Sequence, residues 1–340
     1  RGRGREVGSG AAEEKAERAR RFTAERQEFV ELLREHTCYD LIPASGKIIV
    51  LDTELVVKAA LHALVENRIK SAPLWDSQKE NLVGMITVTD FIDVIRYFFH
   101  HEDRARVFKE EEYQISTWRS RYLELKSSQS MVERPLSMIF AEPDDSICDA
   151  TLKLLRHHLH RIPIIDQENH SVLHMVSMRR ILRFVVCNSG ESTLFQRTMK
   201  ELGIGTFNNV VTVLQDTPLI VVLNLLIERK ISAVPLVDEN GVARGLYTKS
   251  HAAALAQCAD IFAELEKPVQ DFVEPELLET CQRTDTLQHV LVDTMLDRNL
   301  RRVICVDSSN CVAGIIALSD VMSFLLFEED EERYLSCEEE

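Results

Sequence analysis

Basic side chains recur at one position of a repeated sequence pattern. Each lies before or at the start of a short apolar run that ends in aspartate. Because the whole chain carries a net charge of −15, this recurrence predicts that the basic groups converge on one shared anion-binding centre. Solvated strand ends are the alternative interpretation. The residues concerned are Lys70, His160, Arg161, Lys230, Arg301 and Arg302, with Arg179 expected beside them.

A hydroxyl group and a carboxylate stand together where two of the helices are expected to begin. The pairs are Thr89-Asp90 and Ser319-Asp320, each directly after an apolar strand. Backbone N–H groups and the helix dipole favour anions there, and a carboxylate can accept both hydroxyl groups of a ribose. The same residues could merely cap their helices. Their repetition favours a ligand, and the pattern predicts a nucleoside phosphate site.

Four copies of one unit must position these residues. Each copy has an apolar strand ending in Asp76, Asp166, Asp238 or Asp307, then a turn and a second apolar strand, at intervals of about 70 to 90 residues. A helix with apolar residues at helical spacing precedes each first strand, and a further helix follows each second strand. The expected first helices are 53–67, 146–157, 217–229 and 286–298, with N-caps at 52–53, 145–146, 216–217 and 285–286.

One such unit cannot bury both faces of its small sheet, so the units should pair and two pairs should form the body. The predicted fold class is α/β (α+β). The segment 39–50 is expected to be a strand-like edge to which another chain adds a strand. The expected divisions are a charged helical extension at 1–35, repeats at 36–97, 134–187, 206–258 and 277–327, a helical linker at 98–133, linkers at 188–205 and 259–276, and an acidic tail at 328–340.

Composition excludes several classes of protein. The balance of 40 basic against 55 acidic residues disfavours a nucleic-acid partner. Eight cysteines without a C-x-x-C pair predict reduced thiols in an intracellular compartment. No apolar run reaches the roughly 18 residues that span a bilayer, so no membrane partner is predicted. The first residue is Arg1 rather than methionine, and we expect the true N-terminus to be missing.

Catalytic and metal chemistry find little support. The sequence offers neither a nucleophile with its base nor a phosphate loop of the Walker type, which argues against an enzyme. The run His157-His158-Leu159-His160 has no cysteine or carboxylate at ligand spacing, so no metal site is predicted.

The repeated unit resembles tandem cystathionine-beta-synthase (CBS) motifs, which pair into Bateman modules. Strings in the first repeat narrow the resemblance further: Cys-Tyr-Asp-Leu-Ile-Pro at 38–43, Ala-Pro-Leu-Trp-Asp at 72–76 and Val-Gly-Met-Ile-Thr-Val-Thr-Asp-Phe at 83–91. With Leu-Gly-Ile-Gly-Thr at 202–206, they resemble the gamma subunits of AMP-activated protein kinase. The resemblance covers about residues 35 to 326. It implies a flat disk of two Bateman modules, a regulatory rather than catalytic role, and a location in cytoplasm and nucleus.

The resemblance also implies ligands, partners and site residues. AMP, ADP and ATP would bind between repeats, and catalytic alpha and scaffold beta subunits would complete a heterotrimer. The implied nucleotide-binding positions are Lys70, Met85, Thr87, Thr89, Asp90, Ile139, His160, Arg161, Arg179, Thr206, Val211, Lys230, Ile231, Ser232, Thr248, Arg301, Arg302, Ala317, Ser319 and Asp320.

Two positions depart from a simple fourfold site. His251 stands where the resemblance expects the third ribose aspartate, and a neutral imidazole cannot replace two charged acceptors, so this site is predicted to be weak or empty. Arg180 stands at the same position of the second repeat, in keeping with a family whose second site is normally empty. The alternatives are a nucleotide-insensitive scaffold subunit of the same kinase and a CBS-domain regulator of another protein.

Overall fold

The computed structural model describes residues 23–99, 114–120, 138–190, 192–258, 260–274 and 278–326. It contains the helix–strand–strand–helix unit four times, as the sequence predicts. Repeat 1 consists of α2 (Val57–Glu66), β2 (Ser71–Asp76), β3 (Asn81–Thr87) and α3 (Val88–Phe99). Repeat 2 consists of α5 (Ile147–Arg156), β4 (Arg161–Asp166), β5 (Ser171–Ser177) and α6 (Met178–Asn188).

The second half of the chain repeats this order with different helix types. Repeat 3 consists of α8 (Leu219–Glu228), β7 (Ala233–Val237), β8 (Ala243–Thr248) and a 3-10 helix, η4 (His251–Gln257). Repeat 4 consists of a π-helix, η7 (Gln288–Leu296), then β10 (Arg302–Val306), β11 (Val312–Ala317) and α10 (Leu318–Leu326).

The two main strands of each repeat are antiparallel, and each pair contains one shift of register. A short third strand runs parallel to the first strand in three repeats: β1 (Leu51–Asp52), β6 (Val213–Leu214) and β9 (Thr280–Cys281). In repeat 2 a single bridge between Ala141 and Ile164 takes its place. The buried faces of these small sheets are covered by the flanking helices, so each repeat is half of a two-layer unit.

Neighbouring repeats exchange the segments that precede them. The 3-10 helix η1 (Cys38–Leu41) precedes repeat 1 but docks on repeat 2, where the Cys38 N–H donates to the Asp145 carbonyl at 2.8 Å. Helix α7 (Met199–Leu202) precedes repeat 3 but docks on repeat 4, where the Met199 N–H donates to the Asp285 carbonyl at 2.9 Å. The exchange joins repeat 1 to repeat 2 and repeat 3 to repeat 4, which are the two predicted modules.

The segments that follow repeats 1 and 3 return to those repeats. A helix over 115–120 lies against repeat 1, and the Ile115 N–H donates to the Leu55 carbonyl at 3.0 Å. Helix α9 (Ile261–Leu265) and the 3-10 helix η5 (Val269–Phe272) lie against repeat 3, where the Val269 N–H donates to the Thr217 carbonyl at 2.9 Å. Every repeat is therefore completed by backbone from outside its own unit.

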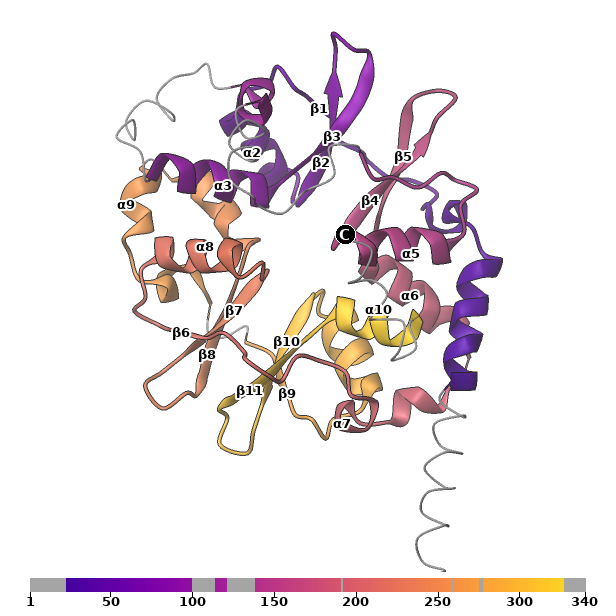
Figure 1. Ribbon diagram of the computed structural model, residues 1–340, viewed down its shortest axis with the longest axis vertical. Helices are drawn as coiled ribbons and strands as arrows, with labels where there is room; N and C mark the ends of the chain where they lie inside the picture. The colour runs from indigo at the N-terminus through magenta and orange to yellow at the C-terminus, as the bar shows by residue number, and fades with distance from the viewer. Residues whose placement is uncertain are drawn as a thin grey trace, which may run out of the picture.

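The four repeats lie around a common centre in the order 1, 2, 4, 3 (Figure 1). Their strands are close to this centre, and helices join the two modules at both sides of the ring. One hydrophobic core combines repeats 1 and 3, and the other combines repeats 2 and 4. Sheets and exchanged segments hold each module together, whereas helix packing joins one module to the other.

A helix over 23–35 seals the core of repeats 2 and 4 from outside. Its Phe29 and Leu33 are buried, and the Phe29 ring packs edge-on against Phe195 of the 3-10 helix η3 (Thr193–Gln196), with centroids 6.0 Å apart. The Glu25 carboxylate accepts the Leu194 N–H at 3.0 Å, so the charged helix is fixed by polar contacts as well. Residues 1–22 of the predicted extension lie outside the described residues.

Three expectations about local structure were wrong. The segment 39–50 is not strand-like at its start: it begins in η1, where Leu41 turns inward and is only 2% exposed. The residues that follow are not paired with another strand in the described part of this chain, and the addition of a strand from another chain stays a prediction. Helix α2 begins after Val56 and not at the predicted cap 52–53. Helix α8 has Pro218 as its N-cap and not 216–217. Of the predicted linker helix, 115–120 is helical, while 100–113, 121–137 and the acidic tail at 328–340 lie outside the described residues.

Within the described ranges, none of the helices combines the length and the apolar character that crossing a membrane requires.

Candidate functional site

A sharp backbone turn precedes the first strand of each repeat. The turn residue has a positive φ in every repeat: Arg68, His158, Lys230 and Asn299. The first strand begins three residues later in all four repeats, so the equivalent positions directly before the strand are Lys70, His160, Ser232 and Arg301.

Lys230 lies at a different position from the other basic residues of the pattern. The residue occupies the left-handed turn itself and is exposed, and it does not line the central cavity. The turn geometry agrees with the sequence, in which Ser232 and Lys70 each lie six residues before the aspartate of their repeat, so Ser232 is the residue equivalent to Lys70. Repeat 3 therefore contributes a hydroxyl group, not a cation, at this position.

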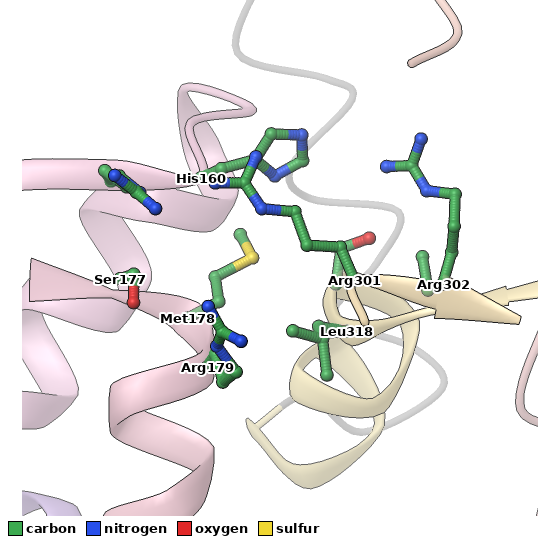
Figure 2. Close-up of a pocket in the computed structure, with 10 residues that line it drawn as sticks. His160, Ser177, Met178, Arg179, Arg301, Arg302 and Leu318 are labelled. Carbon is green, nitrogen blue, oxygen red and sulfur yellow. The ribbon is translucent and has the colours of Figure 1, made fainter. Parts of the chain in front are cut away.

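A cavity that is open to solvent lies between repeats 2 and 4, and its empty space, open solvent included, is about 350 Å³. Figure 2 shows His160 and Arg301 extending toward one another across it, with Arg179 at the start of α6 and Arg302 at the start of β10. Seven of the predicted site residues line it together. The lining residues are His160, Arg161, Ser177, Met178, Arg179, Arg301, Arg302, Ala317, Leu318 and Ser319.

Positive charge accumulates at this cavity without equal negative charge. Burial, together with nearby cations, lowers the pKa of His160 to about 3 and that of Arg301 to about 9. Burial lowers the pKa of Arg302 to about 10, against the opposing influence of Asp320. For Lys70 the pKa falls to about 8 through burial and then through Arg301 and further arginines. These lowered pKa values show that the charged forms are disfavoured at the centre. A bound anion would stabilise the charged forms.

The carboxylates of Asp320 and Asp90 both cap their helices, so the capping interpretation applies to each. An Asp320 carboxylate oxygen accepts the Ala317 N–H at 2.8 Å. An Asp90 oxygen accepts both the N–H and the hydroxyl group of Thr87, each at 2.7 Å. Asp320 also lies close enough to Arg302 to act on its pKa, beside the cavity that Ala317 and Ser319 line. Capping and ligand binding are compatible for a carboxylate with two oxygens.

Asp90 lies at a second cavity, in repeat 1, whose empty space, open solvent included, is about 260 Å³. This cavity is lined mainly by apolar residues of α2, β3 and α3, together with Trp118 from the returning segment. Arg119 follows Trp118 and donates to the Val83 carbonyl at 2.9 Å. Its guanidinium lies over Gly84, whose φ of +153° is a backbone conformation that residues with a side chain rarely adopt, so this position favours glycine. Sequence reasoning missed Arg119.

Repeat 3 keeps the capping geometry with a different side chain. The Nδ1 atom of His251 accepts the Thr248 N–H at 3.2 Å, the bond that a carboxylate makes in repeats 1 and 4. Burial, and then the charge of Lys70, lower the pKa of His251. In repeat 2 the Arg180 side chain turns away from this role and donates to the Leu41 carbonyl of η1.

The remaining predicted positions lie around these sites without lining the central cavity. Thr206 is exposed and pairs through its backbone with Ile315 of β11, and Thr248 ends β8. Thr89 is the second residue of α3, and its N–H donates to the Thr87 hydroxyl at 3.2 Å. The others are partly buried, namely Met85, Ile139, Val211, Ile231 and Ser232.

Lys249 is another residue of the centre that the sequence analysis did not identify. It acts on the pKa of His160 together with Arg301, Arg302 and Arg161, so repeat 3 supplies a cation after all. Aligning the four units after the second strand would have found it, because Lys249 stands where the other repeats have apolar residues.

Among the residues that the structure describes, no group of three or more histidine, cysteine, aspartate or glutamate side chains is placed to hold a metal ion.

The fold and the site together define a protein of paired CBS repeats, and the chain belongs to the CBS domain family. The family model, described as CBS domain, matches residues 39–97, 132–187, 204–255 and 269–327. Within this family the chain is a homologue of the gamma subunits of 5'-AMP-activated protein kinase. It is 40% identical over 316 residues to the gamma subunit of Dictyostelium discoideum, covering 88% of this chain and 53% of that relative.

Other comparisons agree. The gamma-3 subunit of Sus scrofa is 33% identical over 308 residues, covering 88% of this chain and 58% of the relative. The chain thus spans little more than half the length of these curated relatives. A crystal structure from Methanocaldococcus jannaschii, described as a candidate archaeal homologue of gamma-AMPK, has the same fold with a TM-score of 0.69. It is 17% identical and covers 85% of this chain and 99% of that chain.

Proposed function

We propose that this chain is a non-catalytic regulatory subunit that binds AMP, ADP and ATP at its centre and acts on a kinase of the AMP-activated type. The observation that carries the proposal is the convergence of basic side chains from different repeats on one cavity, with Asp320 beside it. The relatives named as gamma subunits of this kinase match over most of the chain, which supports the same assignment.

The geometry suits a nucleoside phosphate bound between repeats 2 and 4. The phosphate group would lie among Arg161, Arg301 and Arg302, because guanidinium groups bind phosphate oxygens through paired N–H donors. The N-terminus of α10 adds a favourable dipole. The second oxygen of Asp320 and the Ser319 hydroxyl group, 3.4 Å from it, would contact the ribose.

Regulation requires that the ligand binds two states of the complex with different affinity. Phosphate charge would draw basic residues of several repeats together and so favour one arrangement of the two modules. A ligand with equal affinity for both states would change nothing, however tightly it bound. We propose that AMP favours the state in which the catalytic alpha subunit is active, that ATP competes with AMP, and that a beta subunit links the two chains. Cytoplasm and nucleus are the proposed locations.

A nucleotide-insensitive scaffold of the same kinase is the second proposal. It is favoured by His251, which removes a ribose acceptor, and by Lys230, which is exposed instead of central. A CBS-domain regulator of another protein would share the cavity but not the similarity to gamma subunits over 88% of the chain.

Calorimetric titration with AMP, ADP and ATP tests the ligand proposal. Saturable binding that is lost in the cavity variant Arg302→Gln would support a nucleotide sensor. If none of the three nucleotides binds, the nucleotide-insensitive scaffold is the remaining proposal. Co-expression with catalytic alpha and scaffold beta subunits tests assembly separately. Recovery of free chain alone, while a control gamma subunit assembles, would refute the kinase assignment.

A further inference from the structure

Two thiols lie side by side at the edge of the repeat-4 sheet. Cys281 of β9 and Cys305 of β10 are directly paired in the register of these parallel strands. Neighbouring strands lie about 4.8 Å apart, and paired residues project from the same face of the sheet. A disulfide joins residues whose Cα atoms are roughly 4.4–6.8 Å apart. The strand pairing therefore places these two cysteines at the spacing that a disulfide needs.

The two thiols differ in acidity. A hydrogen bond to Cys305, together with burial, raises the pKa of the Cys281 thiol. The same hydrogen bond lowers the pKa of the Cys305 thiol, and the Arg283 guanidinium lowers it further, against the effect of burial. Because the thiolate is the nucleophilic form of cysteine, Cys305 is the attacking group and Cys281 stays protonated beside it. In this arrangement a sulfenic acid on the first thiol condenses with the second thiol to a disulfide.

One aromatic ring and one guanidinium cover this part of the sheet. On the third strand, β11, the partner of Cys305 is Gly314, which has no side chain. The Phe207 ring fills the space that a Cβ at Gly314 would occupy, so it lies on the same face of the sheet as the two thiols. The Arg283 guanidinium lies over this ring, 4.0 Å from its centroid. The thiols are therefore buried at a margin of the core that Phe207 and Arg283 cover.

The strand that carries Cys281 is short and lies at the edge. The order of the sheet is β11-β10-β9, and β9 is paired with β10 at only two positions. Cys281 is 3% exposed and Cys305 is fully buried, so a reagent reaches them only when this edge opens. A short edge segment opens locally at a much lower free energy than the whole chain unfolds. Local opening therefore gives a small, uncharged oxidant access to the pair.

We propose that Cys281 and Cys305 form a redox modification site at which hydrogen peroxide converts the two thiols into a disulfide. The Cys305 thiolate attacks one peroxide oxygen, so that an S–O bond forms, the O–O bond breaks and the departing hydroxide takes up the proton that Cys305 had lost. The Cys281 sulfur then attacks Cys305: the S–S bond forms, the S–O bond breaks, and the hydroxyl group leaves as water with the Cys281 proton. The dithiol loses two electrons, which reduce the peroxide to two molecules of water. The new bond ties β9 to β10 around η7.

Peroxide treatment of the full chain tests the site. Remaining thiols are alkylated with iodoacetamide in urea, and non-reducing peptide mass spectrometry then identifies the products. We expect a peptide pair that links Cys281 to Cys305, is two hydrogens lighter than the reduced pair and disappears with dithiothreitol. Cys38 is the control within the same chain, because it is as deeply buried but donates to the Ser146 carbonyl, and burial raises its pKa to about 12. It should still be alkylated at the peroxide concentration that links the pair.

Three variants test the order of the steps and the route of access. Cys281→Ser removes the second thiol, so oxidation should stop at a sulfenic acid on Cys305 that dimedone traps. Phe207→Leu reduces the cover and should link the pair severalfold faster than in the wild type. Phe324→Leu is the matched control, since Phe324 packs against the same hydrophobic core but beneath Arg26, and it should leave the rate unchanged.

The proposal is overturned if no linked peptide forms, or if it forms only where Cys38 is oxidised as well, because the chain has then unfolded. Failure of dimedone to label Cys305 in Cys281→Ser would overturn the assignment of the attacking thiol. Equal rates for Phe207→Leu and Phe324→Leu would overturn access at this margin. These measurements involve no nucleotide, so their outcome is independent of the proposed function.

Discussion

Replacement of Arg302 by glutamine removes the cation at the start of β10, beside Asp320 and within the central cavity. Burial lowers the pKa of this guanidinium from 12.5 to about 10. Since one pKa unit corresponds to about 1.4 kcal/mol, the charged form is about 3 kcal/mol less favourable in the folded, unliganded protein than in the unfolded chain. The cavity therefore keeps a charge that an anion would stabilise.

Two opposite effects follow for Arg302→Gln. The unliganded variant should be no less stable than the wild type, because glutamine removes an unfavourably buried charge. AMP binding should weaken about tenfold to hundredfold, since a hydrogen bond to a charged group contributes about 1.5–3 kcal/mol. The increase in melting temperature that AMP produces should shrink accordingly.

Calorimetric titration and thermal unfolding with and without AMP measure both effects. Arg156→Gln is the matched control, because Arg156 is an exposed residue in the last turn of α5, outside the cavity. The control should retain the affinity of the wild type for AMP. If Arg302→Gln binds AMP as tightly as the wild type does, phosphate is not held at this cavity. If AMP binding is lost but an assembled kinase still responds fully to AMP, signalling does not depend on this centre.

Three further predictions concern pH, packing and Lys230. His160 has a pKa of about 3 in the folded chain and 6.5 in its ordinary state, so below pH 6.5 the unfolded chain takes up a proton that the folded chain does not. The free energy of unfolding should therefore fall as the pH drops from 7 to 5. Over that range, urea unfolding should show a loss for His160→Leu that is up to about 2 kcal/mol smaller than the loss for the wild type. Equal losses would contradict the burial of this imidazole. Gly314→Ala should destabilise the chain by about 1–3 kcal/mol, because the added Cβ would lie 2.9 Å from a backbone oxygen, whereas Gly46→Ala, with its nearest contact at 3.5 Å, should be neutral by the same measurement. Because Lys230 is exposed, Lys230→Gln should leave the affinity for AMP within about twofold of the wild type. A loss of affinity as large as that of Arg302→Gln would show that Lys230 belongs to the binding site.

The sequence alone was enough to predict the repeated unit and the pairing of repeats. The first strands of repeats 1 and 2 were predicted to end at Asp76 and Asp166, where β2 and β4 end, because an apolar run ending in aspartate has the same local chemistry in each copy. The convergence of Lys70, His160, Arg301 and Arg302 was also predictable, since repeats related by rotation bring equivalent residues to one centre.

Tertiary structure decided what depends on contacts between distant segments. Leu41 reads as part of a strand, yet η1 forms because repeat 2 offers backbone partners and an apolar core to that segment. Lys230 reads as a central cation, but the left-handed turn that starts each first strand directs it outward. Lys249 reads as surface, but the ring of repeats brings it near His160. Local sequence specifies the unit, whereas the arrangement of units sets which side chains share a low-dielectric centre, and with it their charge and ligand.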